Sequence, residues 1–411
     1  MPLAGVPYHS VEGYIAKLIQ AGHKVAIVEQ VGEVPTRGLV DREVTRVVTP
    51  GTVVEPSLLE ERCNNYLAAL VVEGKRAGLA YADITTGEFA ATQFSGGDVA
   101  LLLSEELDRL RPAEVVTCDP EFAGQERLGA LSPADTVFTD YERWRFDLDT
   151  ARQALHDHFE VASLDGFGLA GLPLAIQASG ALLQYLAETQ RAKLAQLSSI
   201  RTYSTEQYMT LDAATRRNLE LTETLRRRAV EGSLLGVLDS TVTSMGGRLL
   251  RRWIAHPLLD LERLNRRLDA VAAFYGDTPA RTRLRELLKD VADLERLSSR
   301  VVQAIARPRD LLGMRQSLAA VPQIQALMAQ VDTASEDIRS AVSLDPCQDV
   351  VALLDQALVD DPPATLSAGG VIRPGFSAEL DNILAASRDA KAWVANLEKQ
   401  ERERTGVKSL K

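Results

Sequence analysis

Three carboxylates near residues 66–94 are the first candidates for chemistry in this chain. Asp83 lies inside a segment of alternating hydrophobic residues, whereas Glu73 and Glu88 lie beside turns. Several carboxylates on adjacent strands can bind two divalent metal ions and activate water to hydrolyse a phosphodiester. That chemistry needs three or four acids at matching strand positions, and the sequence supplies only Asp83 there. We therefore predict that Asp83 is an exposed residue at a strand end and that the chain binds no catalytic metal.

Other motifs that carry catalysis are absent from the sequence. It has no GxxxxGK[ST] loop for nucleotide phosphates, no GxSxG nucleophile and no HExxH zinc motif. His156 and His158 are two residues apart, so they point to different sides of the helix predicted there. Gly166 and Gly168 do not belong to a strand–turn–helix unit of the dinucleotide-binding type. We predict that this chain is not itself an enzyme and needs no cofactor.

Composition is that of an ordinary globular protein with several domains. The chain has 411 residues, of which 45% are hydrophobic and 25% are charged. No apolar run reaches about 18 residues, the length that would predict a membrane helix. Cys63, Cys118 and Cys347 are far apart and form no CxxC pair, which favours a reducing, cytoplasmic compartment.

The charge of the chain is unevenly distributed. The formal net charge is −11, which argues against a general nucleic-acid-binding protein. Residues 201–310, however, contain 20 Lys and Arg against 15 Asp and Glu. Two interpretations of this basic segment stay open: a local surface for nucleic acid, or arginines paired with acids on helix faces.

Hydrophobic periodicity predicts an α/β domain over residues 51–165. Three antiparallel strands joined by tight turns are followed by a helix and a fourth strand, at 66–72, 77–84, 89–94, 98–111 and 113–117. This order of elements is typical of ribonuclease-H-like folds. Because the acids of a nuclease are missing, we predict a connecting domain there.

Residues 1–50 contain a helix after Ser10, which ends near Gly22, and a strand at 24–29. One helix–strand unit is too small to form a domain by itself, so we expect the chain to be a piece of a longer protein. The last five residues, VKSLK, also stop within an element.

Residues 166–378 are predicted to be mostly helical, with several short helices at their centre in 203–274. Glycines and Pro257 separate these short helices. One helix is predicted over 282–305 and a helix pair over 309–331. A single helix of about 27 residues follows from 377, and it would extend about 40 Å away from the body.

The central segment resembles a known family. The runs DAATRRNLELTE, TSMGGRLLRRWIAHPL and RLNRRLDAVAAF are similar to the core domain of the MutS family of DNA mismatch-repair proteins, and the resemblance covers essentially the whole chain. The core signature that it implies comprises Asp212, Arg216, Arg217, Asn218, Glu220, Gly247, Arg248 and Pro257.

The resemblance implies a multidomain α+β fold. A ribonuclease-H-like α/β connector would be followed by a mostly helical core and lever with a long protruding helix. The implied order is the C-terminal part of a mismatch-recognition domain, the connector, the core and lever, and the lever helix entering a DNA clamp, over 1–50, 51–165, 166–378 and 379–411.

The resemblance also implies the function and the partners. The family binds mismatched double-stranded DNA as a homodimer, wedges an aromatic residue of a Phe-x-Glu motif beside the mispair, and recruits a MutL-type partner. A C-terminal ATPase that uses ATP and Mg²⁺ switches its state. The wedge would lie upstream of residue 1 and the ATPase downstream of residue 411, so neither is expected in this chain.

Candidate DNA contacts lie near the two ends of the chain. Gly5 and Val6 permit close approach of the backbone, and Tyr8 and His9 carry donors for phosphate. Packing and capping at the start of the first helix is an equally open interpretation for Tyr8 and His9. At the clamp entrance the candidates are Lys408 and Lys411.

Two other functions are weighed against mismatch recognition. A MutS paralogue that clamps recombination junctions is one alternative, but the AGVPYHSVEGYIAKL segment resembles the mismatch-reading domain, which such paralogues generally lack. A nuclease in the connector is the other, and it would depend on Asp83. The arginines of the central segment are expected to hold core helices together, because the family's core transmits state between DNA and ATPase.

Overall fold

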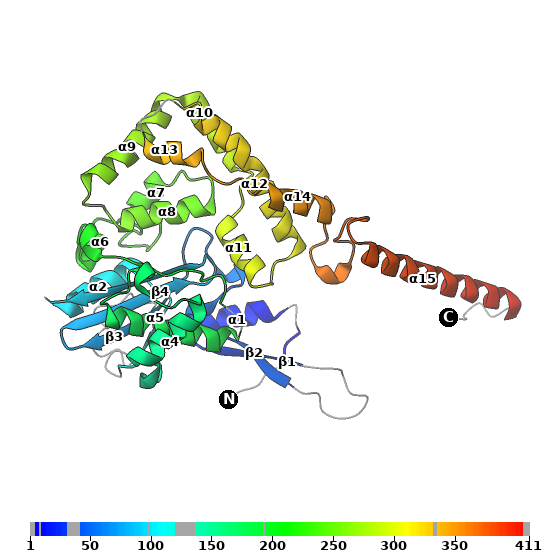
Figure 1. Cartoon of the computed structure of the whole chain (residues 1–411), viewed down its shortest axis with the longest axis horizontal. Helices are drawn as coiled ribbons and strands as arrows, with labels where there is room; N and C mark the ends of the chain where they lie inside the picture. The colour runs from blue at the N-terminus through cyan, green and yellow to red at the C-terminus, as the bar shows by residue number, and fades with distance from the viewer. Residues whose placement is uncertain are drawn as a thin grey trace. The chain divides into compact units, whose positions relative to one another are not determined.

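A computed structural model describes residues 5–7, 10–30, 42–96, 98–119, 136–191, 194–331 and 335–405. The chain divides into two compact units, whose helices and strands are labelled in Figure 1. Unit 1 comprises Met1–Ala306 and Pro322–Leu344, and unit 2 comprises Arg307–Val321 and Asp345–Lys411. Within the described residues, no helix is both long enough and apolar enough to cross a membrane.

Unit 1 begins with a helix and a two-stranded sheet. Their bounds are α1 Val11–Gln20, β1 Val25–Gln30 and β2 Arg42–Val48, and the strands are antiparallel. Gly22 follows α1 with φ +78°, a conformation that glycine adopts without strain, so the predicted helix end is confirmed. Ile15 packs with Val48 and Val53 into a small cluster between these elements.

The larger sheet contains six strands in the part of the chain that the structure describes. Its order is β7-β6-β3-β4-β5-β8. The strands are β3 Leu67–Glu73, β4 Arg76–Asp83, β5 Glu88–Ser95, β6 Glu114–Thr117, β7 Val137–Asp140 and β8 Arg201–Thr202. The first three form an antiparallel meander, and α2, Val99–Leu110, crosses to β6, which is parallel to β3. The strands and helix predicted from periodicity over 66–117 are therefore confirmed.

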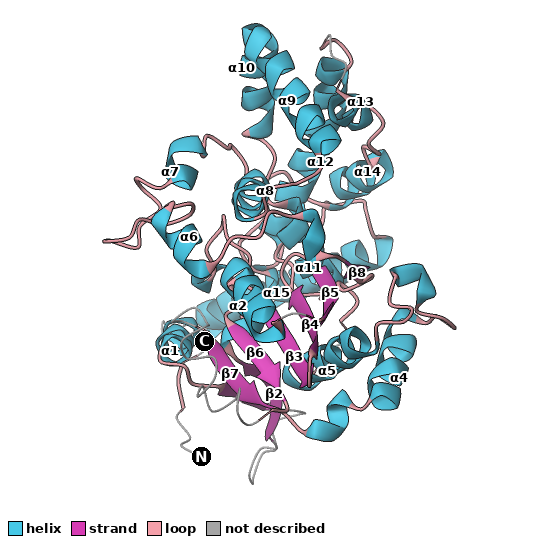
Figure 2. Ribbon diagram, turned by 90° about the vertical axis from the view of Figure 1, so that its left-hand side faces the viewer, coloured by secondary structure: helices cyan, strands magenta, loops and turns pink. Residues whose placement is uncertain are grey.

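Both faces of this sheet are buried, because successive side chains of a strand point to opposite sides. Leu67 and Ala69 belong to one hydrophobic cluster, whereas Ala68 and Leu70 belong to another. The cluster of Leu67 and Ala69 is completed by α4, Leu148–Phe159, and α5, Pro173–Gln190. The cluster of Ala68 and Leu70 is completed by α2 on the opposite face (Figure 2). The domain boundary expected at residue 165 lies between α4 and α5, which pack together on that face.

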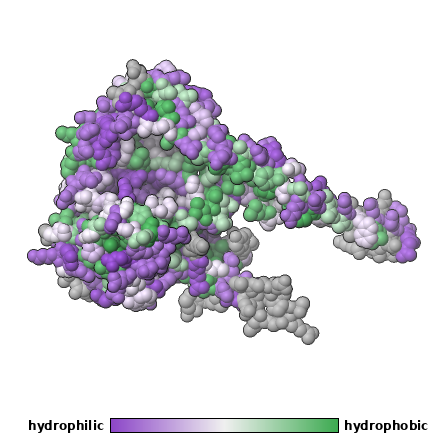
Figure 3. All heavy atoms as spheres, in the orientation of Figure 1, coloured by the Kyte–Doolittle hydropathy of each residue, from purple (hydrophilic) through white to green (hydrophobic). Residues whose placement is uncertain are grey.

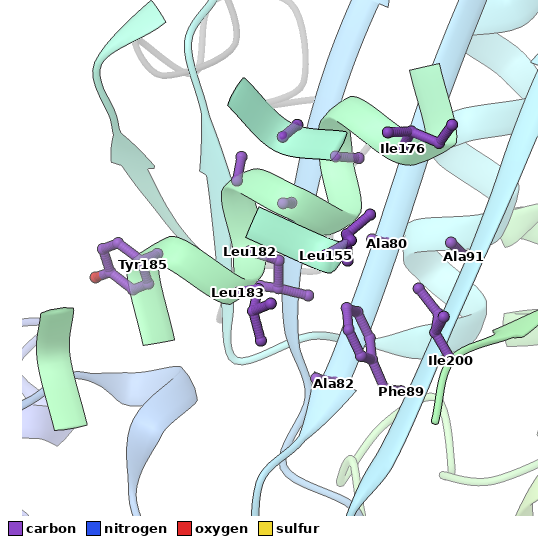
Figure 4. Packing of buried hydrophobic residues seen from close by; sticks show 14 of the residues in the cluster. Ala80, Ala82, Phe89, Ala91, Leu155, Ile176, Leu182, Leu183, Tyr185 and Ile200 are labelled. Carbon is purple, nitrogen blue, oxygen red and sulfur yellow. The ribbon is translucent and has the colours of Figure 1, made fainter. Parts of the chain in front are cut away.

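The α5 face of the sheet has a dense apolar core. In Figure 4, Leu182 and Leu183 of α5 and Leu155 of α4 lie beside β4, which carries Ala80 and Ala82. The small strand residues let the helices approach closely, and hydrophilic side chains cover α4 on the visible outer face in Figure 3.

Close approach also explains two glycines in this core. A Cβ built on Gly78 would lie 2.1 Å from the carbonyl oxygen of Leu174, and one on Gly180 would lie 2.4 Å from the backbone of Ala151. Any larger residue would push α5 away from β4 or from α4.

The rest of unit 1 is helical. Most of these helices begin at a side chain that accepts a backbone N–H, as at Asp212, Thr243 and Asp293, which is a strong start signal. The helices are α6 Ala213–Asn218, α7 Leu234–Leu238, α8 Ser244–Ala255, α9 Leu261–Gly276, α10 Thr278–Leu288, α11 Leu294–Val302 and α13 Glu336–Ala341. Single 3-10 turns occur across the chain at Pro50–Thr52, Pro56–Leu58, Arg143–Phe146, Asp165–Phe167, Thr205–Gln207 and Leu366–Ala368.

Two helix predictions are wrong. The helix predicted over 282–305 is two helices, α10 and α11, because Asp293 accepts the N–H of Arg296 and starts a new helix. The pair predicted over 309–331 is one helix, α12, Pro308–Met328, which contains Pro322. A proline inside a helix removes one backbone hydrogen bond and crowds one carbonyl, and here the flanking turns continue. The division between the two units falls within α12.

Unit 2 combines the first part of α12 with α14, Gln348–Ala357, and α15, Ala378–Thr405. Arg315 of α12 bonds Asp355 of α14 at 3.0 Å and lies 3.9 Å from Asp360, which ties α14 and the loop after it to α12. Arg373 bonds the same Asp360 at 2.9 Å within that loop. The single long helix predicted near the end of the chain is confirmed, and its 28 residues extend about 42 Å. Its protrusion from the body stays a prediction.

Candidate functional site at the junction of sheet and helical core

Arg248 on α8 lies at the centre of the junction between the large sheet and the helical core, and it is 3% exposed. Its guanidinium forms two hydrogen bonds of 2.7 Å with Asp293 and one of 2.6 Å with Glu295. It also donates to the carbonyl of Glu61 at 2.9 Å. Burial alone would lower the pKa of Arg248, but the bonds with Asp293 and Glu295 outweigh burial and raise it. The planar guanidinium of Arg248 is hydrogen-bonded on several sides, so it fixes α8 against α11 and against the turn that precedes β3.

Gly247 provides the space for a second arginine at the same junction. A Cβ on Gly247 would lie 2.9 Å from the Cγ of Arg62. Arg62 in turn bonds the carboxylate of Asp239 at 2.7 Å and the carbonyl of Thr241 at 3.2 Å. The segment before β3 is thus connected to the beginning and the middle of the loop between α7 and α8.

α11 contributes the third arginine. Arg296 is 8% exposed and donates to the carbonyls of Glu60 and Cys63, at 3.0 and 2.7 Å. Gln303, just beyond α11, donates to the carbonyl of Ile84 at the end of β4. Burial raises the pKa of the Cys63 thiol to about 11, so this side chain stays protonated near neutral pH.

Asp83 belongs to the same junction, and the prediction that it is exposed is wrong. Its side chain is fully buried at the end of β4 and accepts four hydrogen bonds. The donors are the Asn64 side chain at 2.9 Å, the Asn65 N–H at 3.2 Å, and the N–H and hydroxyl of Thr85 at 2.9 and 2.6 Å. These neutral donors replace water around the Asp83 carboxylate. The strand pattern in the sequence did not reveal that such donors surround Asp83.

Asp83 therefore stabilises two turns in this structure. Glu73 bonds Arg76 across a tight turn, and Glu88 accepts from Tyr66. Within the described part of the chain, no group of three or more His, Cys, Asp or Glu side chains is placed to hold a metal ion.

The signature residues around α6 make local contacts that shape the start of the helical core. Asp212 caps α6, and Arg216 donates to the carbonyls of Leu211 and Ala255 at 3.0 and 2.9 Å. Burial lowers the pKa of Arg216. Glu220 has a positive φ of 46° and accepts the N–H of Leu225 at 2.7 Å.

The remaining signature residues act mainly through the backbone. Arg217 and Asn218 form the last turn of α6, and the carbonyl of Arg217 accepts from Glu220 at 3.1 Å. Pro257 follows α8, and its carbonyl accepts the N–H of Met209 at 2.8 Å. The end of α8 is thereby attached to the strand-like segment that precedes α6.

A second buried network joins the N-terminal elements to the sheet. Glu114 of β6 is fully buried and accepts from Tyr185 at 2.7 Å, from Thr139 at 2.6 Å and from the N–H of Gly51 at 3.2 Å, and Thr49 also donates to it. Lys24 lies 3.8 Å from the same carboxylate. Burial lowers the pKa of Lys24, and Glu114 partly opposes that shift.

The candidate DNA contacts are separate from these networks. Gly5 and Val6 precede α1, and a Cβ built on Gly5 would meet nothing within 4 Å. Tyr8, His9, Lys408 and Lys411 lie outside the described residues. Sequence reasoning missed Asp293, Glu295 and Glu61, whose role depends on contacts between distant segments.

Residues 1–57 match the family model described as MutS domain I, residues 65–201 match MutS domain II, and residues 214–410 match MutS domain III. The chain belongs to the MutS family. The resemblance seen in the sequence is therefore confirmed. The second match covers the six-stranded sheet with α4 and α5, and the third begins inside α6.

Curated relatives named DNA mismatch repair protein MutS align with the whole of this MutS-family chain. The relative from Symbiobacterium thermophilum is 46% identical over 100% of the chain and 47% of its own length. The relative from Thermosynechococcus vestitus is 44% identical over 100% of the chain and 48% of its own length. The relative from Halothermothrix orenii is 43% identical over 100% and 45%. The chain thus spans about half the length of the curated relatives it matches.

Proposed function

We propose that this chain is the DNA-recognition and coupling part of a DNA mismatch-repair protein. The observation that carries the proposal is the match to MutS domains I, II and III in order, along almost all of the chain. The match to domain I favours repair over a junction-clamping paralogue, because residues 1–57 belong to it.

Recognition of a mispair has a simple physical basis. A mispaired step stacks poorly, so kinking DNA there costs a few kcal/mol less than kinking a paired step. A protein that bends DNA can find such sites without reading sequence, and its affinity for DNA then comes mainly from phosphate contacts. In this chain we propose Gly5, Val6, Tyr8 and His9 as one contact region, and Lys408 and Lys411 as the other.

The junction around Arg248 supplies the coupling. Two buried arginines, Arg248 and Arg296, connect α8 and α11 to the segment before β3, and the exposed Arg62 of that segment bonds Asp239. Breaking a buried ion pair by removing one partner costs about 3–5 kcal/mol, so the sheet and the helical core move together. A movement that begins at bound DNA is then passed to the core as a displacement of rigid elements.

We further propose that the sheet domain is a ribonuclease-H-like connector without nuclease activity. The order β7-β6-β3-β4-β5, with β3 central and parallel to β6, supports the fold. The hydrogen bonds that saturate Asp83 support the lack of metal chemistry. Because α5 and β8 complete this unit, we place its end near residue 202 and the start of the core and lever after it.

The remaining parts of the proposal concern the whole protein. A family member of full length would use ATP and Mg²⁺ in a C-terminal ATPase, act as a homodimer on mismatched DNA, recruit a MutL-type partner and work in the cytoplasm. This chain contributes recognition and transmission. In a family member of full length, the ATPase step would belong to the C-terminal domain.

Equilibrium binding to DNA tests the proposal. Fluorescence anisotropy with a 30-base-pair duplex, with and without one G·T mispair, would be measured between 50 and 200 mM salt. We expect dissociation constants of about 1–100 μM, a steep loss of affinity with salt and little preference for the mispair. Absence of binding, or binding that salt does not weaken, would refute a DNA-recognition role.

Two variants refine this experiment. The double variant Lys408→Gln, Lys411→Gln should reduce the slope of log affinity against log salt concentration by about two. Lys75→Gln, an exposed control in the turn between β3 and β4, should leave this slope unchanged. Tight mispair selectivity in this chain would contradict the placement of the wedge upstream. Cleavage of duplex DNA with Mg²⁺ that Asp83→Asn abolishes would contradict the connector assignment.

A further inference from the structure

A cavity of about 260 Å³ lies in unit 1 between the β8 edge of the large sheet and helices α8 and α9. Among the described residues, its wall is strongly basic and aromatic. The arginines that line it are Arg109, Arg201, Arg252, Arg263 and Arg267. Arg201, Arg252, Arg263 and Arg267 belong to the basic segment 201–310, whose arginines were expected to hold core helices together.

Helical spacing places the lining residues of α8 and α9 on one face of each helix. Arg252 and Trp253 follow Leu249 by three and four residues on α8, so these three lining residues share one face of the helix, and His256 lies just beyond its end. Arg263 and Arg267 are four residues apart on α9, so both point to the same side of that helix. Like charges at this spacing destabilise a helix unless a counter-charge lies nearby.

Two carboxylates outside the cavity lining pair with its arginines and balance only part of this charge. Glu106 bonds Arg109 at 2.6 Å. Glu88 bonds Arg252 at 3.1 Å and lies 3.9 Å from Arg201. Two carboxylates thus serve three of the arginines.

Arg263 and Arg267 carry the surplus positive charge. In the part of the chain that the structure describes, neither forms an ion pair within 4.0 Å. The pKa of Arg267 is lowered by burial and then by the charge of Arg263, and Asp337 offsets only part of this. The cavity therefore lacks the anion that would complete it electrostatically.

The geometry favours an anion with several oxygens. The Arg267 guanidinium lies 3.8 Å from the centre of the Trp253 ring, and this stacking holds it in one orientation. Guanidinium groups bind phosphate oxygens with paired N–H donors. Pockets for drug-sized ligands occupy roughly 300–1,000 Å³, so this smaller cavity suits one or two phosphoryl groups.

We propose that this cavity binds a small phosphorylated anion, either inorganic pyrophosphate or the phosphate groups of a nucleotide, with Arg263 and Arg267 as its main ligands. Arg201 and Arg252 flank them and add charge while remaining bound to Glu88. The bound anion joins α9 to α8 and to the sheet edge. This site is independent of DNA recognition and of the ATPase that the family carries elsewhere.

Isothermal titration of the 411-residue chain with pyrophosphate, without metal, tests the proposal. We expect one site per chain, and we expect Arg263→Gln and Arg267→Gln each to weaken binding about tenfold or more. Arg266→Gln is the matched control, because Arg266 lies on the same helix but bonds Glu336 at 3.1 Å. It should change the affinity less than about twofold.

Arg263→Gln separates binding from folding, because it leaves the stacking of Arg267 on Trp253 intact. Its circular dichroism spectrum and melting temperature without ligand should match those of the unaltered chain. If binding is absent up to millimolar pyrophosphate, or if Arg266→Gln weakens it as much as Arg263→Gln, the site is refuted.

Two competition experiments identify the source of the phosphate. Displacement of pyrophosphate by ATP would assign a nucleotide, and failure of ATP to compete would assign the free anion. Both results agree with the proposal. Displacement by a DNA duplex at the concentration that fills its own binding site would instead make these arginines DNA contacts and overturn the small-anion assignment.

Discussion

Replacing Arg248 by methionine should loosen the docking of α11 on the segment before β3. The side chain of Arg248 is 2% exposed, and that of Asp293 is 17% exposed. Methionine fills a similar volume but leaves the Asp293 carboxylate without its guanidinium. Removing one partner of a buried pair costs about 3–5 kcal/mol. Because Glu295 is 47% exposed and Asp293 keeps the N–H of Arg296, we expect a value of about 3 kcal/mol.

Amide hydrogen exchange measures this effect locally, which matters in a chain of several domains that need not unfold in one step. A loss of about 3 kcal/mol raises the exchange rate of the protected amides in α11 by roughly 150-fold. Arg152→Met is the control, since its ion pair with Asp149 is exposed, and it should change the rates in α4 less than about twofold. Unchanged protection of α11 in the Arg248 variant would refute the role of this arginine as the junction's centre.

Three further predictions concern packing and pH. Gly78→Ala should destabilise the sheet domain because its Cβ would meet a carbonyl at 2.1 Å, whereas Gly13→Ala, in open space within α1, should stabilise its helix by about 0.5–1 kcal/mol in urea unfolding. Leu182→Ala should cost about 2–5 kcal/mol in the same assay, and the exposed control Leu101→Ala less than about 1 kcal/mol; equal losses would exclude the packed core described here. Burial lowers the pKa of His256 to about 2, so the folded state disfavours its charged form. The stabilising contribution of neutral His256 is complete above pH about 6.5 and is lost as the pH falls towards 2. The free energy of unfolding should therefore fall by up to about 1.4 kcal/mol per pH unit, and a His256→Gln variant should lack this dependence in melting experiments from pH 7 to 4.

The local elements were largely accessible to sequence reasoning, because each carries its own signal. The meander β3-β4-β5 follows from period-two alternation separated by tight turns, and α15 follows from an uninterrupted helical stripe. The break between α10 and α11 was missed because leucines continue at helical spacing through it. Only the cap at Asp293 reveals it, and an aspartate inside a leucine pattern has no unique signal.

The site was less accessible, because its charges pair across long sequence distances. Arg248 is separated by 45 residues from Asp293 and by 187 from Glu61. A cluster of arginines in a sequence is compatible with a nucleic-acid surface or with ion pairs. The structure resolves this for Arg62, Arg248 and Arg296, whose guanidinium groups bond carboxylates or carbonyls. Arg263 and Arg267 line a cavity and form no ion pair among the residues that the structure describes.

The amino-acid sequence by itself determined the family, the order of its domains and the position of most elements. Those properties are local or are carried by long ordered motifs, so they do not depend on how the chain closes on itself. Only the tertiary structure decided that Asp83 is buried and saturated by neutral donors, and that Arg248 joins helix to sheet. Burial and pairing depend on which distant segments share a site, because the free energy of a charge depends on its surroundings and not on its neighbours along the chain.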